Sequence, residues 1–138
     1  MLTNASVRRG CDLPITTSIE PTTGARLHGV TGHLNLEELG GTLTKIYESA
    51  DFDADQDVLW NLLKANLSAF SVDDIRQVTQ PVKDNWGASD KSRAALVVAR
   101  DLDFGLTRMY QQLLEGQSSG EVRIFRNVDE AIEWLSTK

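Results

Sequence analysis

The sequence predicts an α/β protein in which a mixed, mostly parallel five-stranded sheet is flanked by helices. Two adjoining segments carry this prediction. Residues 94–99 are a continuous apolar run, which is typical of a strand covered on both faces, and residues 102–114 then place apolar side chains at helical spacing. A short strand over 122–125 and a helix over 128–135 repeat the alternation. Alternating strands and helices specify a parallel sheet.

The first part of the chain is predicted to begin with a hairpin. Residues 1–12 are polar and lack periodicity, so we expect a flexible N-terminal tail followed by a single domain over 13–138. Apolar and polar residues alternate over 13–20, which predicts a strand. A turn at 21–24, with proline first and glycine last, should join it to an antiparallel strand over 25–32.

Two helices and a strand follow the hairpin. Asn35 is expected to cap a helix over 36–47, whose Gly40-Gly41 pair would cost about 1 kcal/mol per glycine unless close packing against the sheet explains it. Residues 58–63 form the third predicted strand. Ser71 opens a capping box for the next helix, and Pro81 should kink or restart that helix. The predicted order is therefore β-β-α-β-α-β-α-β-α.

Composition narrows the possible partners and location of the protein. With 138 residues and a net charge of −6, the chain lacks the basic balance of a nucleic-acid binder. It contains no run of about 18 apolar residues, so membrane insertion is not expected. No apolar segment follows the first charged residues, and the lone Cys11 fits a reducing compartment. We therefore expect a cytoplasmic protein.

No segment of the sequence matches a catalytic or metal-binding motif closely enough to predict such a site. The acidic segment 51–57 resembles the start of a calcium loop, but it lacks the glycine at the sixth position and has Leu62 at the twelfth, so a solvated loop is expected. His28 and His33 lack a metal-binding spacing, and one cysteine cannot complete a zinc site. No nucleophile elbow or phosphate-binding loop is present. We expect no catalytic residue, cofactor or metal.

The fold nevertheless predicts where a ligand would bind. Open parallel sheets bind ligands beyond the carboxyl ends of their strands, which here correspond to residues 31–35, 63–71 and 100–103. Three of the polar residues there, Ser71, Asp101 and Asp103, also suit helix caps. The candidate ligand or regulatory site comprises Asn61, Lys64, Asn66, Ser68, Ser71, Arg100, Asp101 and Asp103.

Two apolar features leave alternatives open. Trp134 lies roughly 120° from the apolar stripe of the last helix, so it either packs on a neighbouring element or joins an exposed patch that forms a homodimer interface. The helix over 102–114 is apolar over more than one stripe. It is either packed in the core, or one of its sides lines a lipid-sized groove or a partner surface.

Four segments carry a resemblance to a known family. They cover residues 58–62, 93–98, the Phe-Gly-Leu-Thr-Arg-Met-Tyr run at 104–110, and 122–135. Together they resemble the SpoIIAA-like bacterial proteins, which are relatives of the STAS domain and structurally similar to the lipid-binding domain of Sec14. The resemblance spans about residues 13–136. It implies a small sheet flanked by helices and no settled catalytic activity.

The wider STAS group also suggests a regulatory role. Its members bind partner proteins, and anti-sigma antagonists are switched by phosphorylation of a serine that opens the helix after the third strand. By position, the resemblance points to Ser68 or Ser71, although residues 66–71 lack the Asp-Ser-Ser/Thr-Gly type of motif. The leading hypothesis is a non-enzymatic regulatory module that binds a protein partner. The alternatives are a carrier of a lipid or other small apolar ligand and an enzyme with a site at 61–71 and 100–103.

Overall fold

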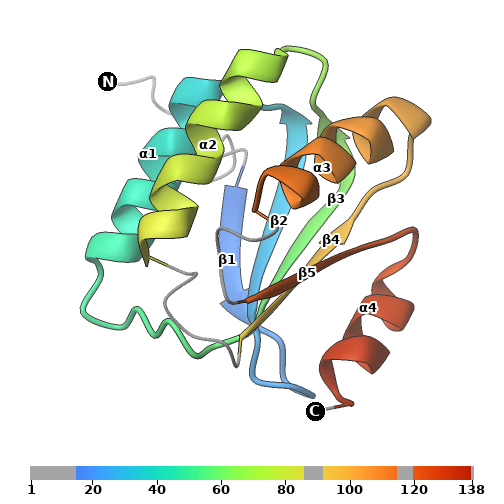
Figure 1. Ribbon diagram of the computed structural model, residues 1–138. Coiled ribbons are helices and arrows are strands. Elements are labelled where there is room, and N and C mark those ends of the chain that lie inside the picture. Colours follow the sequence, from blue (N-terminus) through green and yellow to red (C-terminus); the bar gives the residue numbers. More distant parts are fainter. Residues whose placement is uncertain (1–14, 86–91, 115–119, 138) are drawn as a thin grey trace, which may run out of the picture.

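A computed structural model describes residues 15–85, 92–114 and 120–137. The predicted tail at 1–12 and much of the polar loop at 84–92 lie outside these residues. The described elements follow the predicted order (Figure 1). They are β1 (Ile15–Ile19), β2 (Arg26–His33), α1 (Leu36–Glu48), β3 (Val58–Asn66), α2 (Val72–Asn85), β4 (Arg93–Val97), α3 (Asp101–Leu114), β5 (Glu121–Phe125) and α4 (Val128–Leu135).

The five strands lie side by side in sequence order. β1 pairs with β2 antiparallel, and β2, β3, β4 and β5 are parallel neighbours. Each parallel strand is therefore added on the same side of the previous one. Crossovers of one hand then place α1, α2 and α3 on one face of the sheet, and Figure 1 shows α4 on the other.

The sheet separates two apolar layers. Alternation along β3 and β4 sends Val58, Leu62 and Leu96 toward α1, α2 and α3, whereas Leu59 and Val97 face α4. Both faces of the central strands are covered, which explains why β4 is a continuous apolar run. The layer under the three helices is the larger of the two.

The helix cap at Asn35 and the hairpin turn agree with those predicted from the sequence. Asn35 caps α1 in a capping box, because its Oδ1 accepts the Glu38 N–H at 2.8 Å and its own N–H donates to Glu38 Oε1 at 3.3 Å. The hairpin turn closes at Gly24, whose φ of 75° lies in the left-handed region that favours glycine. The predicted antiparallel hairpin is confirmed.

Three local features differ from one of the interpretations that the sequence offered. β3 runs to Asn66, so Lys64 belongs to the strand and not to a loop. α2 continues through Pro81 to Asn85, so the helix does not restart there, whereas a kink at Pro81 stays a prediction; the Asn85 side chain donates to the Pro81 carbonyl at 2.8 Å. A Cβ atom added at Gly40 or Gly41 would meet no described neighbouring atom within 4 Å, so close packing does not explain that pair.

Candidate functional site

The polar residues predicted at the end of β3 mostly stabilise their own backbone. Asn66 Oδ1 accepts the Ser68 N–H at 3.0 Å, and Asn61 Oδ1 accepts the Leu63 N–H at 3.2 Å. Ser71 forms the predicted capping box with Asp74, through bonds of 3.1 Å and 3.0 Å. Lys64 and Ser68 are exposed.

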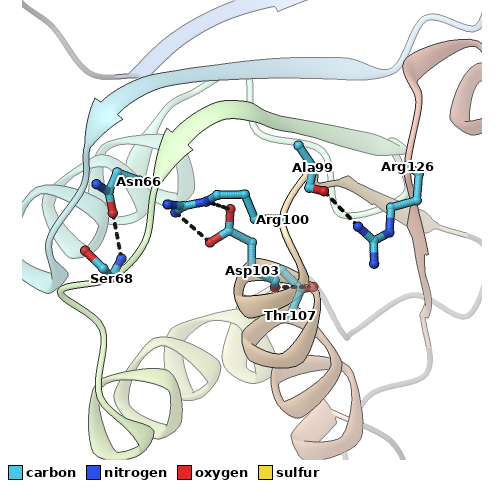
Figure 2. A network of polar contacts seen from close by, with 7 residues as sticks. All are labelled: Asn66, Ser68, Ala99, Arg100, Asp103, Thr107 and Arg126. Atoms are coloured by element: carbon cyan, nitrogen blue, oxygen red, sulfur yellow. Dashed lines mark hydrogen bonds and ion pairs between the residues drawn. The ribbon is translucent and has the colours of Figure 1, made fainter.

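An ion pair between Arg100 and Asp103 lies just after the end of β4, where α3 begins (Figure 2). Arg100 donates from Nε and Nη2 to the two oxygens of Asp103, both at 3.0 Å. The Asp103 side chain is 1% exposed and that of Arg100 is 48% exposed. This bidentate bond raises the pKa of Arg100. Asp101 is fully exposed and lies 3.2 Å from Arg126, which also donates to the Ala99 carbonyl at 2.8 Å.

The structure therefore brings part of the predicted site to one edge of the sheet. Figure 2 shows Asn66 and Ser68 on one side of this edge and Arg100 and Asp103 on the other, with the Arg100 side chain between them. Asn61 and Lys64 lie within β3, where Asn61 pairs with Val97 at the end of β4, and Ser71 serves as the cap of α2. Residues 15–85, 92–114 and 120–137 contain no cluster of potential metal ligands. A ligand at this edge remains a prediction.

A cavity of about 110 Å³ lies elsewhere, between the sheet and the helices α1, α2 and α3. Its walls are aliphatic and aromatic side chains, including Leu62 and Leu96 of the sheet, Val78 of α2 and Tyr110 of α3. Helix α3 is thus packed in the core, and one of its sides also faces the cavity. None of the eight predicted site residues lines it.

Arg26 and His28 give this cavity a polar end. They are alternate residues of β2 near its amino end, where Arg26 pairs with Val58 at the start of β3. Arg26 Nε donates to His28 Nε2 at 3.1 Å, so this ring nitrogen is the acceptor. The opposite nitrogen, Nδ1, then carries the proton and donates to Thr17 Oγ1 at 3.0 Å. The His28 ring lies 4.4 Å from that of Trp60.

The ionisable side chains that line the cavity beside Arg26 are neutral. Burial and the adjacent Arg26 charge lower the pKa of His28 to about 4. Burial raises the pKa of Tyr47 to about 12, although the nearby charge of Arg26 lowers this pKa in part. Burial also raises the pKa of Tyr110 well above its usual value. At neutral pH the cavity is therefore apolar, with hydroxyl and imidazole groups and one guanidinium cation on its walls.

Arg26 is not among the residues predicted from the sequence, and His28 was considered only as a metal ligand. One signal could have identified both. Arg26, His28 and Val30 alternate with Leu27 and Gly29 along one strand. When helices cover both faces of a sheet, neither set of alternating side chains of an inner strand faces solvent. A polar residue in such a strand must therefore pack against other side chains.

Two further residues, Asp57 and Trp134, are buried. Asp57, in the segment expected to be a solvated loop, is buried, and its Oδ1 accepts the Arg93 N–H at 2.9 Å. Trp134 is 9% exposed and packs against Phe125, with the guanidinium groups of Arg93 and Arg123 over its ring at 5.0 Å and 5.2 Å. It thus packs on neighbouring elements, and a homodimer contact there remains a prediction.

The arrangement of strands and helices is one that known structures share. The fold is similar to that of an uncharacterized protein of the DUF3478 family from Shewanella loihica PV-4, described as having a SpoIIAA-like fold. The TM-score is 0.55, the sequence identity is 16%, and the match covers 88% of this chain and 91% of that chain. This chain therefore has a SpoIIAA-like α/β fold, which confirms the fold that the sequence resemblance implied.

Sequence comparisons add no closer identification. No protein-family model matches the chain, and no curated protein matches it. At 16% identity, the structural similarity establishes the fold and says nothing of a ligand. Within the described ranges, no helix is long and apolar enough to cross a bilayer. The function must accordingly be argued from the geometry of the chain itself.

Proposed function

We propose that the protein is a non-enzymatic binding module that holds a small apolar ligand in the cavity between the sheet and α1, α2 and α3. The observation that carries this proposal is the apolar cavity itself, about 110 Å³ in volume. Well-packed domains leave few voids larger than a water molecule. An apolar cavity of this size costs stability when it is empty, and an apolar guest recovers the lost contacts.

The size of the cavity favours a compact ligand. An engineered cavity of about 150 Å³ in another protein stays dry and binds benzene. The volume of about 110 Å³ suits a single ring or a short branched chain more closely than a long acyl chain. Phe70 and Tyr47 on its walls offer ring faces and edges for such a guest. A small apolar molecule therefore fits better than a whole lipid.

Toluene titration with a cavity-filling variant tests this function. Ala94 is buried on β4 and lines the cavity, so Ala94→Leu should fill part of it, whereas Ala69→Leu adds the same atoms at an exposed site. We expect saturable shifts of the Trp60 indole resonance in the unmodified protein and in Ala69→Leu. Ala94→Leu should lose them. Absence of saturable shifts in the unmodified protein would contradict the proposal.

A second candidate, binding of a protein partner under the control of phosphorylation, is supported by the exposure of Ser68. Figure 2 shows the Arg100 side chain extending toward Asn66, at the end of β3, and Ser68, in the loop that follows. A phosphate on Ser68 would lie at the edge where Arg100 remains half exposed. At Ser71 it would disturb the capping box and meet the carboxylates of α2 at Asp73 and Asp74. Ser68 is therefore the better acceptor.

Separate alanine substitutions distinguish the two serines. Ser68→Ala and Ser71→Ala are incubated with bacterial extract and labelled ATP, with Ser49→Ala as a control at another exposed serine. We expect the label to disappear from Ser68→Ala alone. Equal labelling of all three variants and the unmodified chain would remove this candidate and leave the ligand-binding proposal intact.

A further inference from the structure

Arg26 is a buried cation for which the described residues supply no carboxylate partner. It is 9% exposed, and its guanidinium lies 5.3 Å from the centre of the Phe52 ring. Its Nη1 donates to the neutral side chain of Gln56 over a long 3.4 Å, and its Nε donates to neutral His28. The ion pairs formed by other arginines in the described residues do not include it.

Such a cation is costly to bury without an anion. Removing a charge from water is repaid only where an opposite charge and good hydrogen bonds replace the solvent. Burial lowers the pKa of the Arg26 guanidinium, an effect that Tyr47 and Asp53 oppose, but arginine keeps its proton in proteins. Among the described residues, the exposed carboxylate of Asp53 acts on Arg26 only from beyond ion-pair distance, so no carboxylate contacts the guanidinium.

The neighbours of Arg26 orient it and leave donors free. His28 is held in one tautomer by Thr17 and presents only an acceptor to Arg26 Nε. The Tyr47 hydroxyl is neutral, and the exposed Asp53 directs its Oδ1 to the Asp55 N–H. Nη2 of Arg26 makes no hydrogen bond with any described residue, so its N–H groups can bind a carboxylate.

Cavity size and charge together define the ligand. We propose that the cavity binds a compact monocarboxylate, with a ring-sized apolar body between the sheet and the helices and its carboxylate on Arg26. This inference rests on the proposed function, because it needs the cavity to accept a guest. It adds that the amino end of β2, and not the carboxyl ends of the strands, selects the ligand by charge.

Benzoate and benzamide test the inference, because they share a ring and differ in charge. We expect calorimetric titration to show at least tenfold tighter binding of benzoate. Arg26→Met should abolish this preference while toluene binding persists. The matched control, Arg108→Met, removes an exposed arginine of α3 that does not line the cavity, and it should retain the preference.

The outcomes separate the two proposals. Equal binding of benzoate and benzamide to the unmodified protein would overturn the charge-selective site and leave a neutral apolar pocket. Absence of binding by toluene, benzamide and benzoate alike would overturn the proposed function as well. A preference for benzoate that survives Arg26→Met would exclude Arg26 as its cause. If Arg26→Met does not fold, the Arg26 Nε–H resonance of the unmodified protein decides: benzoate should shift it and benzamide should not.

Discussion

The side chains of Arg26 and His28, two residues apart on β2, share a hydrogen bond of 3.1 Å in the interior of the protein. The bond requires His28 to accept, so the ring must be neutral while Arg26 is charged. Arginine is rarely buried so fully unless it is paired. The pair links the stability of the fold to the chemistry of the cavity.

Acid should destabilise the protein through His28. Its pKa is lowered to about 4 in the folded chain, so the unfolded chain binds more protons between about pH 6.5 and pH 4. The stabilising contribution is fully present above about pH 6.5 and is lost as the pH falls toward 4, by about 3 kcal/mol in total. Urea unfolding across this range measures it.

Two substitutions isolate this effect. His28→Gln should flatten the dependence of the unfolding free energy on pH over this window, whereas His33→Gln, at an exposed position of β2, should preserve it. Parallel curves for His28→Gln and the unmodified protein would show that other groups cause the acid sensitivity.

Loss of Trp134 should destabilise the fold without changing oligomeric state. Its ring fills the layer under α4 beside Phe125, so Trp134→Ala should lower the free energy of unfolding by about 3–5 kcal/mol. Leu102→Ala, at an exposed site of α3, should change it by less than about 0.5 kcal/mol. Sedimentation velocity would instead favour the predicted interface if the unmodified protein were a dimer and folded Trp134→Ala a monomer.

Gly41→Ala should stabilise the protein. Gly41 lies in α1 with open space where a Cβ would be added, so alanine gains helix propensity of about 1 kcal/mol without a clash. Gly24→Ala provides the contrast, because its positive φ strains an L-residue and should lower stability. Thermal and urea unfolding compare the two. A loss of stability in Gly41→Ala would mean that the glycine has a role that local packing does not reveal.

Asp103 should matter more than its neighbour Asp101, although both lie in the first turn of α3 and both contact an arginine. Asp103 is buried and receives two bonds from Arg100, whereas Asp101 is fully exposed. Asp103→Asn should therefore lower the urea midpoint clearly, and Asp101→Asn should leave it nearly unchanged. Equal effects of the two substitutions would show that the bidentate bond adds little to stability.

The sequence predicted the scaffold because local signals and packing agree. The apolar run at β4, the cap at Asn35 and the box at Ser71 each identify an element, and strict alternation with helices then implies parallel pairing. The extent of β3 could not be predicted as well, because Lys64 and Asn66 are polar residues that backbone pairing with β2 holds in the strand. The length of β3 therefore depends on its pairing with β2 and not on its own residues alone.

The candidate site was harder to predict for a different reason. Rules for parallel sheets direct attention to the carboxyl ends of strands, and there the predicted residues form caps and turns with one another. The cavity depends on how α1, α2 and α3 pack over the sheet, which no single segment encodes. Arg26 lies at the opposite end of the strands, where those rules place no ligand.

The cavity is bounded by three helices and the strands β2, β3 and β4, so its walls come together only in the folded chain. A molecule that binds there binds the native state alone and raises the free energy of unfolding in proportion to the logarithm of its concentration. At a hundredfold excess over its Kd the gain is about 2.7 kcal/mol. A collection of small acids can thus be ranked by the rise in melting temperature that each one causes, before any biological pathway is known.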